Sequence, residues 1–176
     1  MDLHQLITFI GDSNNTEKLY PLIMNESKAI CDLLKDPKDV LHLASVKLPV
    51  ITLLAEKQPQ LLADKFKDVS SFLSFAKVAD YAAFHMINHH SSSVISLFKT
   101  PSELAELAIC AKTASALLFV LENEKIKELF KSGEVLDELM QKCQEVNPVA
   151  YDVFLGIIEW VKWHNKNRQE NTDSSD

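Results

Sequence analysis

Apolar residues recur at the spacing of an amphipathic helix along most of the chain. Between residues 36 and 54, and again between residues 104 and 118, apolar side chains follow one another at intervals of three or four positions. Because an α-helix turns once every 3.6 residues, this spacing places them on one side of a helix. The pattern predicts an all-α fold.

The helical pattern itself recurs at a fixed spacing of about 32 residues, here called the repeat interval, and such self-similarity is typical of repeat proteins. A lysine occurs once in every repeat interval, and the residue before each of these lysines is large and apolar. Three further apolar positions also recur every 32 residues. These positions are Lys35, Lys67, Lys99 and Lys131; Leu34, Phe66, Phe98 and Phe130; Ile30, Leu62, Val94 and Ile126; Val40, Phe72, Leu104 and Leu136; and Leu43, Phe75, Leu107 and Leu139. We expect an α-solenoid-like bundle of about four degenerate helical units with atypical capping helices, and the three phenylalanines that precede lysines in the core between units.

Each unit is predicted to begin a helix directly after its lysine. The lysines are followed by Asp36, Asp68, Thr100 and Ser132, whose side chains can accept hydrogen bonds from the free N–H groups at a helix start. Thr100 and Glu103 also have the spacing of a capping box. In two units a proline stands at the first helical position, where its missing N–H costs nothing.

A break is expected near the middle of each unit. Pro49 in the first unit and Asn147-Pro148 in the fourth favour it, because an interior proline removes a helical hydrogen bond. A shorter helix, for example Lys125–Phe130, then leads to the next unit. The predicted unit is a helical hairpin with a short connecting helix.

Two short motifs resemble those of a known repeat family. Thr100-Pro101 followed by Leu117-Leu118 resembles the Thr-Pro and Leu-Leu landmarks of an ankyrin repeat, and Pro37 with Leu53-Leu54 matches part of the same pattern. The inter-helix glycine and the Gly-rich hairpin of ankyrin repeats are absent.

Over residues 25–160 the chain is therefore similar to ankyrin-like or HEAT-like α-solenoids. It resembles the divergent helical-repeat modules found in effector proteins of intracellular bacteria. The resemblance implies a surface that binds another protein, and it implies no catalytic residues.

A single domain over residues 1–166 is predicted, followed by a short polar tail. Residues 1–24 are expected to form an N-terminal cap outside the repeat register, residues 25–148 the repeats, and residues 149–166 a C-terminal capping helix. Residues 167–176 are polar and expected to be disordered.

The net charge and the lengths of the apolar stretches indicate which classes of partner the protein can bind. The net charge is −7 and Arg168 is the only arginine, which argues against binding to nucleic acid. No apolar stretch reaches the ~18 to 20 residues of a transmembrane segment, and the N-terminus lacks the features of a cleavable signal peptide. We expect a soluble protein that is cytoplasmic, or secreted into a host cytosol without a cleavable signal peptide.

Few residues have the type and spacing of a catalytic, metal-binding or cofactor-binding site. His85 and His89 are one helical turn apart and are the weak candidates for a metal site beside His90, but no third ligand pattern completes it. With only three glycines, the chain offers no phosphate-binding loop. Cys31, Cys110 and Cys143 lack CxxC spacing and are interpreted as reduced, packing thiols. No catalytic residue, resident metal or cofactor is predicted, and the protein is not expected to be an enzyme.

The C-terminal helix carries apolar residues around more of its circumference than one core-facing stripe requires. The spacing assigns Val153, Phe154, Ile157 and Val161 to the stack, and Leu155, Trp160 and Trp163 to a partner surface.

The preferred function is a non-catalytic protein–protein interaction module that binds a protein partner or a second copy as a homodimer. Two alternatives stay open. One is a small helical enzyme or metal/ligand-binding protein that uses the region of His85, His89 and His90. The other is a membrane-peripheral or oligomerisation module that uses Trp160 and Trp163.

Overall fold

The computed structural model describes residues 2–12, 16–130, 137–153, 155–156, 158–160 and 163, and all regular secondary structure within them is helical, as predicted. The eleven helices with assigned bounds are α1 (Leu3–Asp12), α2 (Thr16–Leu33), α3 (Pro37–Val46), α4 (Leu48–Lys57), α5 (Pro59–Ala63), α6 (Val69–Val78), α7 (Asp80–Ile95), α8 (Pro101–Cys110), α9 (Lys112–Leu121), α10 (Asn123–Phe130) and α11 (Asp137–Val146). Described residues after Pro148 are also helical and form what we call the C-terminal segment.

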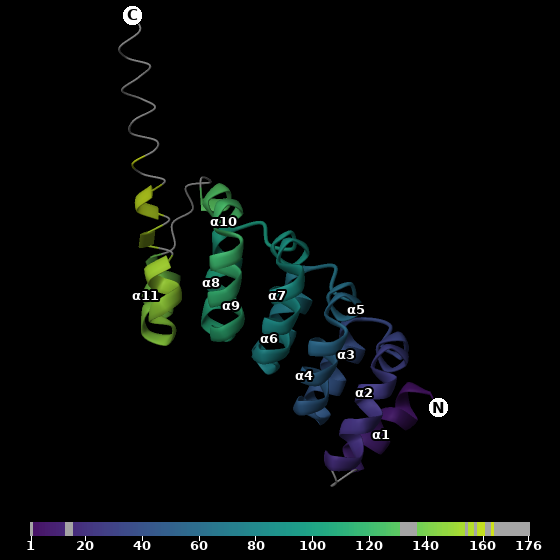
Figure 1. Ribbon diagram of the computed structural model, residues 1–176. Helices are drawn as coiled ribbons and strands as arrows, with labels where there is room; N and C mark the ends of the chain where they lie inside the picture. Colours follow the sequence, from purple (N-terminus) through teal and green to yellow (C-terminus); the bar gives the residue numbers. More distant parts are fainter. Residues whose placement is uncertain are drawn as a thin grey trace, which may run out of the picture.

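The helices lie side by side in one curved row from the N-terminus to α11 (Figure 1). Two sets of contacts run along this row. The helices α1, α3, α6, α8 and α11, here called the first helices, pack each against the next, and so do α2, α4, α7 and α9, the second helices. Each of α3, α6 and α8 also packs on the second helix that follows it, and we call these two helices a pair; the short helices α5 and α10 lie at the end of the pairs that points upward in Figure 1.

The first helices begin where the sequence predicts. The helices α3, α6 and α8 start at residues 37, 69 and 101, one repeat interval apart each time. Asp36 accepts hydrogen bonds from the N–H groups of Lys38 and Asp39, and Asp68 accepts one from Ser71. The predicted capping box of Thr100, at the start of α8, is complete. Each cap satisfies N–H groups that have no partner inside the helix.

Two of the lysines before these caps, Lys35 and Lys99, bind carbonyl groups at the end of the preceding helix. The ammonium group of Lys35 donates to the carbonyl oxygen of Asp32 at 2.7 Å, and that of Lys99 donates to Ser96 at 2.5 Å. A cation at a helix C-terminus is favourable because the last carbonyl groups are unpaired and the helix dipole is negative there.

One residue separates each first helix from its second helix. Lys47, Ala79 and Ala111 have non-helical backbone, with φ of −150°, −131° and −141°, and each also donates its N–H to the helix before it. The break predicted around Pro49 is therefore present, and Pro49 itself stands in the first turn of α4, where proline is tolerated.

The second helices end or are interrupted at equivalent residues. Gln58, His90 and Glu122 have φ of −134°, −140° and −115°, and they follow one another at the repeat interval. Glu26 interrupts α2 with a φ of −114°, one repeat interval before Gln58. The apolar columns predict that residues 1–24 lie outside the register, yet α2 begins one repeat interval before α4 and breaks in phase with it.

The fourth unit departs from the gapless register. The helix α11 begins at Asp137, and the break residue Asn147 lies four positions further from Ala111 than the repeat interval allows. The prediction of one constant interval for every unit is therefore wrong here, and Ser132 lies outside the described residues. A shift of four residues moves a position about one turn along a helix, so apolar columns still coincide with apolar positions and hide the slip.

The predicted aromatic column is buried. Phe66, Phe98 and Phe130 are exposed by only 4%, 2% and 8%. The ring of Phe72 packs edge-to-face against Phe66 at 5.6 Å between centroids and against Phe98 at 6.2 Å. Phe72 thus joins the aromatic residues of two successive pairs in one core.

Candidate binding surface

Part of the accessible surface of the second helices is largely apolar, and we call this part the second-helix face. Its positions are exposed or half-exposed and share the register of the helix starts. They are Tyr20, Pro21 and Met24 on α2; Pro49, Thr52, Leu53 and Glu56 on α4; Tyr81, Phe84, His85 and Asn88 on α7; and Thr113, Ala116, Leu117 and Val120 on α9. Among these described positions, Glu56 is the only acidic or basic residue apart from His85.

Three of the first helices, α3, α6 and α8, differ from this face. Their fully exposed side chains on α3, α6 and α8 are polar with the exception of Val78. They are Lys38, His42, Ser45, Ser70, Ser74, Lys77 and Glu106. Fully exposed apolar side chains are thus more frequent on the second helices than on α3, α6 and α8, although Lys57, His89 and Lys112 are also exposed on the second helices.

A groove of about 630 Å³ crosses the second-helix face. It lies between α2, α4 and the start of α7, and most of its lining is apolar. The lining residues are Leu19, Tyr20, Ile23, Lys47, Leu48, Pro49, Val50, Thr52, Leu53, Glu56, Val78, Ala79, Asp80 and Tyr81. Two tyrosines border it from different helices, Tyr20 with 53% exposed and Tyr81 with 65% exposed.

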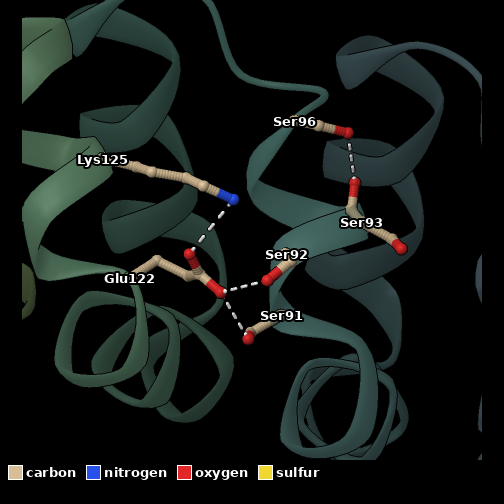
Figure 2. Close-up of polar contacts among 6 residues, drawn as sticks. All are labelled: Ser91, Ser92, Ser93, Ser96, Glu122 and Lys125. Carbon is tan, nitrogen blue, oxygen red and sulfur yellow. Dashed lines mark hydrogen bonds and ion pairs between the residues drawn. The ribbon is translucent and has the colours of Figure 1, made fainter.

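Polar contacts join consecutive pairs of helices. The hydroxyl groups of Ser91 and Ser92 donate to one carboxylate oxygen of Glu122, at 2.5 and 3.0 Å, and the Lys125 ammonium lies 3.4 Å from the other oxygen (Figure 2). Burial raises the pKa of Glu122, but the hydrogen bonds from the two serines and the charge of Lys125 outweigh it, and the pKa is lowered.

A related contact stands two units earlier. The Gln58 amide donates to the Ser27 hydroxyl at 3.0 Å, and these residues lie two repeat intervals before Glu122 and Ser91. In each case the residue that ends a second helix bonds to the short helical segment of the preceding unit. These hydrogen bonds join helices that are about 31 residues apart in the sequence.

The histidine candidates do not belong to a larger group of metal-binding side chains among the described residues. The His85 ring packs edge-to-face on Phe84, with 5.6 Å between centroids, and His89 lies on the same helix beside His90. His90 is the residue that breaks α7. No cluster of three or more histidine, cysteine or acidic side chains suited to a metal occurs in the part of the chain that the structure describes.

The cysteines are poor nucleophiles. Burial raises the pKa of Cys31 to about 12 and that of Cys110 to about 11, and it also raises the pKa of Cys143. A thiol reacts as its thiolate, so these groups are essentially unreactive near neutral pH. Cys31 and Cys143 are buried, as expected for packing residues, while Cys110 is half-buried.

The C-terminal residues assigned to a partner differ among themselves. Leu155 and Trp163 are exposed by 40% and 60%. Trp160 is half-buried against the core, and the Lys127 ammonium of α10 lies 4.7 Å from the centre of its ring. Part of the Trp160 side chain therefore packs within the molecule and is covered by its own chain. Of the residues assigned to the stack, Val153 packs on the core, and Phe154, Ile157 and Val161 lie outside the described residues.

No column of the sequence repeat predicts the second-helix face. The sequence nevertheless contains an indication of this face, because Tyr20, Tyr81 and Val120 are large apolar residues at exposed helical positions. These residues can be assigned to one face only when the break residues show where each second helix begins.

No helix in the described part of the chain combines the length and the apolar character that a membrane-spanning segment requires.

Comparison with known proteins gives no relative for this arrangement. No family model, no curated protein sequence and no solved structure matches the chain.

Proposed function

We propose that the chain is a non-catalytic protein-interaction module, built as an α-solenoid of helical repeats, whose binding surface is the second-helix face. The repeat is supported by helix starts at residues 37, 69 and 101 and by breaks of similar backbone geometry at Gln58, His90 and Glu122. In such a stack each unit packs only on its neighbours, and outward positions vary without disturbing the core.

The observation that carries the function is the asymmetry between the two layers. Soluble proteins rarely leave a large contiguous apolar patch open to water unless something binds it. Tyrosine is also enriched at protein interfaces because its ring is large and rigid and carries a hydroxyl group. Tyr20 and Tyr81 have this character on the second-helix face, whereas the fully exposed side chains of α3, α6 and α8 are polar apart from Val78.

An interaction module is favoured over the histidine-based alternative. A small enzyme or a metal-binding protein needs polar groups that converge in a pocket. The groove between α2, α4 and α7 is lined mainly by apolar side chains, and His85 and His89 are not among its lining residues. Leu155 and Trp163, exposed on the C-terminal segment, are proposed to extend the partner surface at that end of the row.

The test compares capture by matched variants of the full chain. Wild-type protein, the double variant Tyr81→Ser with Val120→Ser, and the control Phe9→Ser are immobilised and exposed to a native extract, and the bound proteins are identified by mass spectrometry. Phe9 is an exposed aromatic residue of a first helix, 50% accessible. We expect a set of proteins held by the wild type and the control and lost by the double variant. Identical capture by all three proteins would contradict the assignment of the face.

A further inference from the structure

We infer that the buried side chain of Asn147 selects the register in which α11 packs on the α8–α9 pair. The sequence of α11 is compatible with two registers. One continues the 32-residue repeat interval, and the other, which the structure adopts, is displaced from it by four residues. The inference concerns this end of the row and is independent of the binding surface proposed above.

Apolar side chains distinguish poorly between the two registers. With an unbroken repeat interval, Leu136 and Leu139 correspond to two buried leucines of α8. In the observed register, Met140 and Cys143 correspond to the same leucines, and both are buried. Each register thus offers apolar residues at these two places, because a shift of four residues is close to one helical turn. A contact other than apolar packing is needed to choose between them.

Asn147 supplies a contact that depends on the register. It is 4% exposed, and its amide nitrogen donates to the carbonyl oxygen of Ala108 at 2.8 Å and to the hydroxyl oxygen of Ser115 at 3.3 Å. Ala108 lies in the last turn of α8, where carbonyl groups lack partners within the helix. The amide oxygen of Asn147 accepts the N–H of Ala150 at 3.3 Å, so the same side chain also caps the C-terminal segment.

The contact between the two preceding pairs lacks these groups. Its break residue is Ala111, whose side chain cannot donate a hydrogen bond, and the position that corresponds to Ser115 is Ala83. Ser115 is nevertheless fully buried, like Ala83. A hydroxyl group therefore occurs in this buried column at the place where it can accept a hydrogen bond from Asn147.

The other register removes the partners of the amide. A return to the unbroken repeat interval brings Asn147 to the position that corresponds to Ser115, which is fully buried in each of the earlier units. It also brings Cys143 to the place beside Ala108, whose carbonyl oxygen loses its amide donor. Buried polar groups without partners are costly, so the amide favours the observed register. A single buried asparagine selects the register of coiled coils in the same way.

Nuclear magnetic resonance of the isotopically labelled full chain tests the inference. The variants are Asn147→Leu, which removes every polar contact of the side chain, and Asn147→Ser, whose hydroxyl can still cap Ala150 but does not replace the amide donor. The control is Asn88→Leu, at an exposed asparagine of α7. Nuclear Overhauser contacts of Ala108 and Ser115 identify the register, because residue 147 lies beside them in the observed register and residue 143 takes its place in the other. Circular dichroism measures the helix content of each variant.

Wild type and the control should give one set of α11 resonances. Both variants of Asn147 should give a second set with contacts of residue 143, and the ratio of the minor register to the major one should rise at least about tenfold. One set of resonances with wild-type contacts in both folded variants would overturn the inference, because apolar packing alone would then set the register. Loss of α11 helicity in both variants without a second register would also overturn it, since Asn147 would then be required to form the helix and not to place it. Neither outcome bears on the second-helix face, which none of these contacts involves.

Discussion

The carboxylate of Asp80, in the first turn of α7, accepts a hydrogen bond at 2.8 Å from the backbone N–H of Ala114, in the first turn of α9. Its other oxygen accepts the N–H of Thr113 at 3.0 Å. A side chain of one second helix thus caps the next one, a role usually filled by the residue just before a helix. The residue in that place before α9 is Ala111, whose side chain cannot accept a hydrogen bond.

Replacing Asp80 should therefore destabilise the stack through its neighbour. Asp80→Ala leaves two N–H groups at the start of α9 without their acceptor, and the expected cost is about 0.5 to 2 kcal/mol of unfolding free energy. Urea denaturation followed by circular dichroism measures it. Asp152→Ala, which removes an exposed carboxylate from the C-terminal segment, is the control and should change stability by less than about 0.5 kcal/mol. Equal losses in the two variants would contradict the capping role.

Substitution in the buried column of Phe66, Phe98 and Phe130 should lower the free energy of unfolding more than Asp80→Ala does. Phe98→Ala removes a ring that is 2% exposed and packed against Phe72, so it should cost about 3 to 5 kcal/mol. Phe9→Ala removes an exposed ring and should be nearly neutral. A melting temperature that Phe98→Ala leaves unchanged would show that the ring is not part of the core.

Glu122 should make stability depend on pH in the acid range. Its folded-state pKa is lowered, so its contribution is present above the ordinary glutamate pKa of about 4.3 and is lost as the pH falls through the folded value. Denaturation of wild type and Glu122→Gln at a series of pH values measures the contribution as a difference. That difference should favour wild type at neutral pH and shrink below about pH 4.3. Glu124→Gln, at the more exposed Glu124 of α10, is the control. A constant difference at all pH values would contradict the role of the ionised carboxylate.

The thiols should be protected in the folded protein. Cys31 and Cys143 are buried with raised pKa values, so iodoacetamide at mildly alkaline pH should label neither until denaturant is added. Cys110 is half-buried and should react slowly, because its pKa is raised to about 11. Mass spectrometry of labelled peptides separates the three sites. Rapid labelling of Cys31 without denaturant would show that α2 opens in the native state.

The two tryptophans should behave differently. Trp160→Ala loses core packing and the contact with Lys127, with an expected cost of at least about 1 kcal/mol. Trp163→Ala removes a ring that is 60% exposed, so stability should change little while any partner affinity that depends on it falls. Thermal melts of both variants distinguish them. If Trp163→Ala is the more destabilising, the packing assigned to Trp160 is wrong.

Much of the fold could be predicted because local chemistry determines it. Asp36, Asp68 and Thr100 are strong helix caps, and the prolines beside two of them fix the start further. The four-residue slip before α11 could not be predicted, since apolar residues one helical turn apart keep the same pattern.

The candidate surface was harder to predict than the core. A buried column appears in the sequence as an apolar residue that recurs every 32 positions. Tyr20 and Tyr81 belong to different columns, and only the folded structure shows that both line the groove. The packing of the second helices brings them together. Helical spacing alone places Trp160 on the surface, because it does not reveal Lys127, which approaches from another helix.

The backbone breaks at Glu26, Gln58, His90 and Glu122 also bear on how such a chain can change in length. Their φ angles lie between −114° and −140°, so the four points are close to interchangeable as joining sites. Excision or duplication of the segment between two of them leaves ends that meet in nearly the same geometry. In the proposed repeat, recombination at these points would lengthen or shorten the chain in whole segments, and the proposed second-helix face would change in area with no new fold.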